Sequence, residues 1–140
     1  MSAAIGDAAL TELLRSARTI AVVGASSNPA RASYNVLGFL LQAGYDAIPV
    51  NPDPSFSTVH GVPVIDTLAQ VDRAIDIVDV FRRRDAFLSV TEEAVALGAK
   101  TVWGQLGVYD PKAAALAQKA GLTVVMDRCI KTELIRLGLA

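Results

Sequence analysis

Five short apolar runs, each followed by a helical pattern, constrain the fold of this chain more than any other feature. The runs are continuous rather than alternating with polar residues, which is typical of strands covered on both faces. They lie at 19–24, 46–50, 74–80, 101–105 and 122–126. With right-handed crossovers, they predict an α/β fold: a Rossmann-like, doubly wound, five-stranded parallel sheet in the order 3-2-1-4-5 with helices on both faces. Asp76 and Asp79 interrupt the third run, so one side of that strand is expected to face solvent or the sheet edge.

The helical patterns between the runs have recognisable ends. Two apolar stripes stop at Gly44 and Gly98, and glycine often ends a helix. Asp110 predicts an N-cap, because Pro111 suits the first helical position. A helix at about 8–17 precedes the first strand and another, carrying residues 130, 134 and 137, closes the chain. The Pro-, Ser- and Gly-rich stretch from 51 to about 63 is expected to be a surface loop.

Length and composition predict one domain spanning 1–140. A chain of 140 residues that is 52% hydrophobic can bury a core without disulfides or metals. The net charge of −1 disfavours nucleic acid and anionic membranes as partners, because both need a broad basic surface. A single cysteine, no signal-peptide pattern and no apolar run of about 18 residues predict a cytoplasmic protein.

A candidate phosphate-binding loop follows the first strand, in the segment VVGASSNP at 22–29. In this fold the loop leads into a helix whose free N–H groups and positive dipole end attract phosphate. Gly24 permits a tight turn and close approach of the backbone. Ser26 and Ser27 add hydroxyl donors, and Arg31 adds a fixed charge with a bidentate fork. The alternative is an ordinary turn in which the serines cap the helix.

This loop departs from the dinucleotide fingerprint Gly-x-Gly-x-x-Gly. Ser26 replaces the second glycine and Pro29 stands near the third. The fingerprint also wants an acidic residue after the second strand for the ribose hydroxyls, where this chain has Asn51 and Pro52. Asp53 comes two residues later. NAD is therefore the less favoured ligand.

Several segments, in this order and spacing, resemble the small CoA-binding proteins, whose domain also forms the N-terminal part of the succinyl-CoA ligase α subunit. They are AVVGAS at 21–26 with Arg31, GYDAIPVNP at 44–52, DIVDVFR at 76–82, GAKTVWGQLG at 98–107 and VMDRCIK at 125–131. The resemblance covers almost the whole chain after residue 18. It implies coenzyme A, or an acyl-CoA, as the ligand of a Rossmann-like domain.

The resemblance and the fold together nominate ligand-binding residues, no catalytic residue and no metal. The nominated residues are Gly24, Ala25, Ser26, Ser27, Arg31, Ser33, Asn51, Pro52, Val80, Phe81, Arg82, Gln105, Leu106, Gly107 and Cys129. The ligase itself needs a second domain with a phosphorylated histidine. The only histidine here is His60, which is expected to be a solvated loop residue, so ligase chemistry is not expected of this chain.

Three of these regions have competing interpretations. Of the arginines at 82–84, Arg82 is the candidate for the 3′-phosphate of CoA, with Val80 and Phe81 beside the adenine or in the core. Gln105 is the candidate for a pantetheine amide, because the loop after the fourth strand is expected across the ligand crevice. Cys129 begins the last helix between two cations, so it is either a reactive thiol or an inert buried one.

Three functions remain open on this reading. The leading one is non-catalytic binding of CoA or an acyl-CoA, by a homodimer or a partner subunit. The second is a CoA-linked thiol–disulfide enzyme that uses Cys129. The third is an NAD(P)-binding oxidoreductase or redox sensor, which Asn51 and the missing glycines disfavour.

Overall fold

A central parallel sheet organises the computed structural model, which describes residues 4–53 and 55–140. Its strands are β1 (Thr19–Val23), β2 (Asp46–Val50), β5 (Ile77–Val80), β6 (Thr101–Gly104) and β7 (Thr123–Val125). They lie in the order β2-β1-β5-β6-β7 and all pair in parallel. The expected fold class, a Rossmann-like five-stranded parallel sheet, is confirmed.

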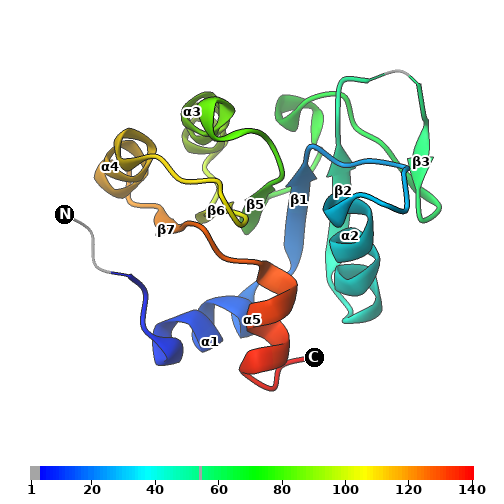
Figure 1. The fold of residues 1–140 in the computed structure, drawn as a ribbon. Helices are drawn as coiled ribbons and strands as arrows, with labels where there is room; N and C mark the ends of the chain where they lie inside the picture. Colours follow the sequence, from blue (N-terminus) through cyan, green and yellow to red (C-terminus); the bar gives the residue numbers. More distant parts are fainter. Residues whose placement is uncertain (1–3, 54) are drawn as a thin grey trace.

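Helices cover both faces of the sheet (Figure 1). One face carries α1 (Asp7–Ser16), α2 (Ala32–Gln42) and α5 (Ile130–Arg136), and the other carries α3 (Phe87–Leu97) and α4 (Pro111–Lys119). Successive strand residues enter opposite cores: Ile20 and Val22 pack with α1, α2 and α5, whereas Ala21 and Val23 pack with α3 and α4. Because both faces of each central strand are buried, the strands read as continuous apolar runs.

The third expected strand, β5, lies beside β1 rather than beyond β2. Ile77 is opposite Ile20 and Val80 is opposite Val23, so the five strands numbered along the chain follow 2-1-3-4-5. The expected order 3-2-1-4-5 also wound outward from the first strand but placed the third at an edge. The chain from β2 returns across the α3 face, where Leu68 of the short 3₁₀ helix η1 (Leu68–Gln70) is buried. A right-handed crossover in that direction brings β5 to the far side of β1.

This central position corrects the expectation of a wet side on the third strand. Asp79 is 0% exposed, between Val22 of β1 and Trp103 of β6. Asp76 precedes β5 and is partly buried, and its carboxylate accepts hydrogen bonds from the backbone N–H groups of Arg18 and Thr19 at 2.8 and 3.0 Å. The two aspartates therefore have different roles, which their spacing in the sequence did not distinguish.

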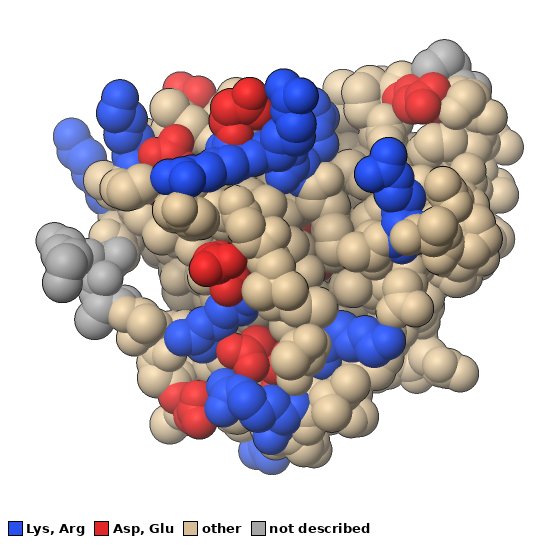
Figure 2. Space-filling model, in the orientation of Figure 1, with Lys and Arg blue, Asp and Glu red and all other residues tan. Residues whose placement is uncertain are grey.

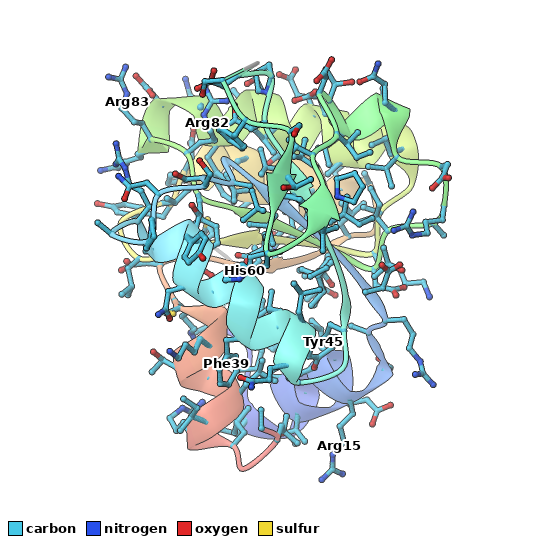
Figure 3. All side chains as sticks on the ribbon, turned by 90° about the vertical axis from the view of Figure 1, so that its right-hand side faces the viewer. Arg15, Phe39, Tyr45, His60, Arg82 and Arg83 are labelled. Atoms are coloured by element: carbon cyan, nitrogen blue, oxygen red, sulfur yellow. The ribbon has the colours of Figure 1, made fainter. Side chains whose placement is uncertain are left out.

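The expected surface loop after β2 contains a small hairpin of β3 (Thr58–Val59) and β4 (Val62–Pro63). His60 at its tip is exposed but not free: its Nε2 lies 2.8 Å from the carbonyl oxygen of Tyr34, and its ring stacks on Tyr34 at 4.0 Å between centroids. Figure 3 shows His60 against α2. The histidine thus holds the hairpin on the helix rather than serving as a purely solvated residue.

Candidate functional site

The loop between β1 and α2 is built around a close approach of two backbones. Gly24 has a φ of 90°, a conformation that side chains rarely adopt. Its N–H donates to the carbonyl oxygen of Val50 at 2.9 Å, and the N–H of Ala25 reaches the same oxygen at 3.3 Å. A Cβ at Gly24 would collide with the carbonyl oxygen of Phe81, which follows β5. Glycine is therefore what lets the loops after β1 and β5 meet.

The loop leaves the first turn of α2 free of side-chain caps. The Ser26 hydroxyl accepts from the N–H of Asn28 at 3.0 Å, which turns the loop on itself. The N-cap of α2 is Arg31, and no side chain in the described part of the chain caps the turn. The serines therefore do not cap the helix, which was the alternative to a phosphate loop. Uncapped first-turn N–H groups are the usual anion-binding end of a helix.

Asn51 fixes the loop from the neighbouring strand. Its Nδ2 donates to the carbonyl oxygen of Ala25 at 2.7 Å, and its Oδ1 accepts from the N–H of Asp53 at 2.8 Å. Both ends of the amide are thus occupied by protein. Asn51 stands where a dinucleotide-binding protein carries an acidic residue, but here it supports the loop, and the exposed Asp53 turns toward the same cleft.

A cleft of about 340 Å³, which we call the β1 cleft, opens above these loops. It gathers seven of the residues nominated from the sequence and three others. The nominated residues are Gly24, Ala25, Ser26, Arg31, Ser33, Asn51 and Phe81, and the others are Ala32, Asp53 and Phe56. Phe56 could not be recognised in the sequence because its loop carries no periodic pattern, and only the folding of 51–65 back onto β2 brings it here.

Two arginines beside the β1 cleft form no ion pair within the described ranges. Arg31 and Arg82 are exposed and make no ion pair with any residue in the described ranges, and Arg82 approaches Gly24 through its Cδ. By contrast, Arg83 pairs with Asp85 at 3.3 Å, and Arg84 stacks on Tyr109, at 3.7 Å from the ring centroid. Arg82 is thus the arginine of the three that remains available for an anion.

The figures show Lys and Arg at both ends of the molecule. Figure 2 shows their side chains in the upper part of its face, the end at which β1 and β2 finish in Figure 1, and also in the lower part, with Asp and Glu among them. Figure 3 shows Arg82 and Arg83 at this upper end and Arg15 at the opposite end. Arg82 thus lies at the end of the molecule where β1 and β2 finish.

The other nominated residues lie outside the lining of the β1 cleft. Ser27 and Pro52 are exposed beside it, Val80 is completely buried in the core under α3, and Leu106 is 70% exposed. The N–H of Gly107 donates to Asp127 at 2.7 Å. Because β5 lies next to β1, the direction in which successive strands are added to the parallel sheet reverses between these two strands, so the crevice lies there and not between β1 and β6 as expected.

Gln105 and Cys129 form a second group, under the start of α5. Gln105 is buried, and its Oε1 accepts from the N–H of Ile130 at 3.1 Å, so that oxygen is used by the protein rather than free for a pantetheine amide. Cys129 is the N-cap of α5 and is half-buried. Part of this residue is therefore exposed at the surface.

Hydrogen bonds, rather than the flanking cations, favour the thiolate of Cys129. Burial alone would raise the pKa of this thiol, but hydrogen bonds from Thr132, Gln105 and the Lys131 N–H outweigh it and leave the pKa below its ordinary value. The flanking cations point elsewhere: Arg128 pairs with Glu133 at 3.2 Å, and the Lys131 ammonium donates to Asn35 at 2.8 Å. The pKa of Cys129 is therefore lowered, as a reactive thiol requires, but by hydrogen bonds and not by the adjacent cations.

Two kinds of site are absent from the described part of the chain. Residues 4–53 and 55–140 hold no cluster of three or more His, Cys, Asp or Glu side chains that could bind a metal ion. No helix in these ranges is both long enough and apolar enough to span a bilayer.

Comparison with known proteins shows that the chain matches one protein family and is similar in structure to several solved proteins. Residues 18–135 match the family model described as CoA binding domain. The uncharacterized protein YneT of Bacillus subtilis (strain 168) is 40% identical over 124 residues, which cover 89% of this chain and 90% of YneT. A hypothetical protein from Pyrococcus horikoshii OT3 superposes with a TM-score of 0.91 at 34% identity, covering 98% of this chain and 97% of that one. A Thermus thermophilus protein, cell-free ID.343, has a TM-score of 0.88 at 36% identity, with 95% and 99% covered.

Proposed function

Because the chain belongs to the CoA binding domain family, we propose that it binds coenzyme A or an acyl-CoA in the β1 cleft, as a binding protein rather than an enzyme. One observation carries the location: the uncapped first turn of α2 and two unpaired arginines surround a glycine that brings the backbone close. Backbone N–H groups and arginine forks are the donors that bind phosphates best. The diphosphate of CoA matches the loop, and its 3′-phosphate matches Arg82.

The rest of the ligand is assigned by chemistry. Phe56 and Phe81 line the β1 cleft and offer flat apolar surfaces to the adenine. The pantetheine arm would then run past the end of β5 toward Cys129. We propose no catalytic residue for the β1 cleft itself, since its polar side chains hold the loop rather than one another in a nucleophile–base pair.

A ligand comparison tests the choice of CoA over NAD. Calorimetry is expected to show CoA binding with NAD at least about tenfold weaker, a difference of about 1.4 kcal/mol. The reason is that Asn51 stands where dinucleotide-binding proteins carry a carboxylate for the ribose hydroxyls, and both ends of its amide already bond to the protein. Asp53, whose carboxylate lines the β1 cleft, is the feature that favours the alternative NAD(P) function. Equal or tighter binding of NAD would replace the proposed ligand.

Removing one charge tests the place of the phosphates. Arg31→Ala is expected to weaken CoA binding by about one to two decades, because a charge-assisted hydrogen bond contributes roughly 1.5–3 kcal/mol. Arg83→Ala is the matched control: it also removes an exposed arginine near the carboxyl end of β5, but one that pairs with Asp85. Calorimetry on both variants, with circular dichroism to check folding, gives the comparison. Equal losses in the two would point to general charge attraction and not to the β1 cleft.

A further inference from the structure

Asp79 is a buried acid for which the fold gives no partner. It lies in the middle of the central strand, 0% exposed, with Val22 and Trp103 beside it in the sheet. Neither carboxyl oxygen has a hydrogen-bond partner in the described part of the chain. Buried polar groups in proteins are nearly always hydrogen-bonded, and leaving one unpaired costs stability. Asp76, by contrast, accepts two backbone N–H groups and performs an evident structural task.

Cys129 is the charged group that acts on this carboxyl. Burial raises the pKa of Asp79 well above its ordinary value, and the negative charge of a Cys129 thiolate raises it further. β1 and β6, which flank Asp79 in the sheet, contribute no ionisable side chain over their lengths. The charged residues of α5 all have partners: Glu133 pairs with Arg136 and with Arg128, which precedes the helix, Arg136 also pairs with Asp7, and the Lys131 ammonium is bonded to Asn35. Trp103, which lies opposite Asp79 in the sheet, donates from its Nε1 to the carbonyl oxygen of Arg128 at 2.7 Å, so the residues that begin α5 lie over this part of the sheet.

We propose that Cys129, with Asp79 buried behind it, is a thiol–disulfide exchange site for the disulfide of a small thiol compound, CoA disulfide in particular. The choice of CoA disulfide rests on the proposed function, whereas the exchange itself does not. Cys129 is not fully buried, and the hydrogen bonds from Thr132 and Gln105 stabilise the thiolate that would attack a disulfide.

The exchange balances without a further reactant. The Cys129 thiolate attacks one sulfur of the disulfide, a new bond forms to Sγ, and the substrate S–S bond breaks. The electron pair leaves with the second half of the substrate, which departs as a thiolate and takes a proton from water. Cys129 is oxidised to a mixed disulfide, and one equivalent of the small thiol compound is the reduced product.

Asp79 acts through Cys129 as a positioning residue. The negative charge of a Cys129 thiolate favours the protonated form of the buried Asp79 carboxyl, in the same direction as burial does. A protonated Asp79 leaves the thiolate unopposed when Cys129 attacks, and again when it departs on reduction of the mixed disulfide. Forming the mixed disulfide removes the sulfur's charge, and the carboxyl is then easier to ionise.

Mass spectrometry of the intact chain tests the exchange. CoA disulfide is expected to add the mass of one CoA, less two hydrogens, to the protein, and Cys129→Ser is expected to abolish the addition. Hydroxyethyl disulfide, which has no nucleotide, is expected to react more slowly than CoA disulfide, and reduced CoA in the β1 cleft should slow it further. No adduct with either disulfide overturns the inference. Adducts with both at equal rates, without protection by CoA, support the exchange and remove CoA disulfide as its particular substrate.

A carboxyl titration tests the role of Asp79 without a variant that must refold. ¹³C NMR of the aspartate carboxyls is followed against pH before and after Cys129 is capped as the mixed disulfide. Capping is expected to shift the Asp79 titration to lower pH, because the repelling thiolate is gone. Asp76 is the internal control: hydrogen bonds from Thr19, Arg18 and Lys100 set its pKa, so its titration should not move. If the pH of the Asp79 titration is the same before and after Cys129 is capped, the proposed interaction between Asp79 and Cys129 is wrong.

Discussion

Gly24→Val is expected to abolish CoA binding and to cost roughly 2–6 kcal/mol of folding stability. A valine at a φ of 90° is strained, which costs about 1–3 kcal/mol. Its Cβ also collides with the Phe81 carbonyl oxygen, and forcing extra atoms into a packed contact costs about 1–3 kcal/mol more. Relief of the collision would separate the loops after β1 and β5, which form the β1 cleft. Urea unfolding and calorimetry with CoA measure the two effects.

Gly44→Val is the matched control, because it separates strain from collision. Gly44 has a φ of 96°, nearly that of Gly24, but no atom lies within 4 Å of a Cβ built there. The control is expected to lose the strain contribution alone and to keep CoA binding, because Gly44 lies between α2 and β2, away from the lining of the β1 cleft. If the two variants lose equal stability and both bind CoA, the close approach at Gly24 does not matter.

The stability of the protein is expected to fall as pH rises because of Asp79. Burial holds the pKa of this carboxyl well above its value in the unfolded chain, near 3.9. The folded state therefore binds more protons than the unfolded state between the two pKa values. The Asp79 contribution is fully present below the unfolded pKa and is lost toward the folded pKa, by up to about 1.4 kcal/mol per pH unit. Over several pH units this is a large share of an ordinary domain's stability.

Asp79→Asn is the variant that isolates this dependence, since asparagine does not ionise. Its amide stays without a partner and costs roughly 1–3 kcal/mol at every pH. Asp76→Asn is the control of opposite sign: burial of Asp76 is outweighed by its hydrogen bonds, so its pKa is lowered. The stability that Asp76 contributes is present above the unfolded pKa and is lost as pH falls through the folded one. Urea unfolding of the three proteins at pH 4.5, 6 and 8 should show the wild type losing stability relative to Asp79→Asn as pH rises; parallel curves would contradict it.

Local sequence patterns predicted most of the secondary structure correctly. The apolar runs at 19–24 and 46–50 became β1 and β2 almost residue for residue, and Asp110 caps α4 by accepting from the Lys112 N–H at 2.9 Å. The run at 74–80 became a strand only at 77–80, because Asp76 is used to bind the backbone before β1. The loop proposed to bind phosphate could be nominated for the same local reason, since Gly24, Ser26 and Arg31 are close together in the chain.

Features that depend on distant contacts were not readable in this way. Phe56 enters the β1 cleft, and Gln105 turns under α5, only because segments far apart in the chain pack together. The thiolate of Cys129 was expected to be stabilised by adjacent cations, whereas in the structure hydrogen bonds stabilise it. The cations bind other residues: Arg128 pairs with Glu133, and Lys131 donates to Asn35. Adjacency in sequence says little about where a long, flexible side chain ends.

By itself, the sequence determined the fold class, the family and the loop that begins the ligand site, because apolar periodicity, glycine positions and helix caps are short-range properties. Only the tertiary structure decided that β5 pairs with β1, that the crevice opens between them and that Asp79 lies without a partner in the sheet. The physical reason is that strand pairing is a long-range choice. The apolar faces of β5 could be buried beside β1 or beyond β2, and the return of residues 65–75 across the α3 face selects between them.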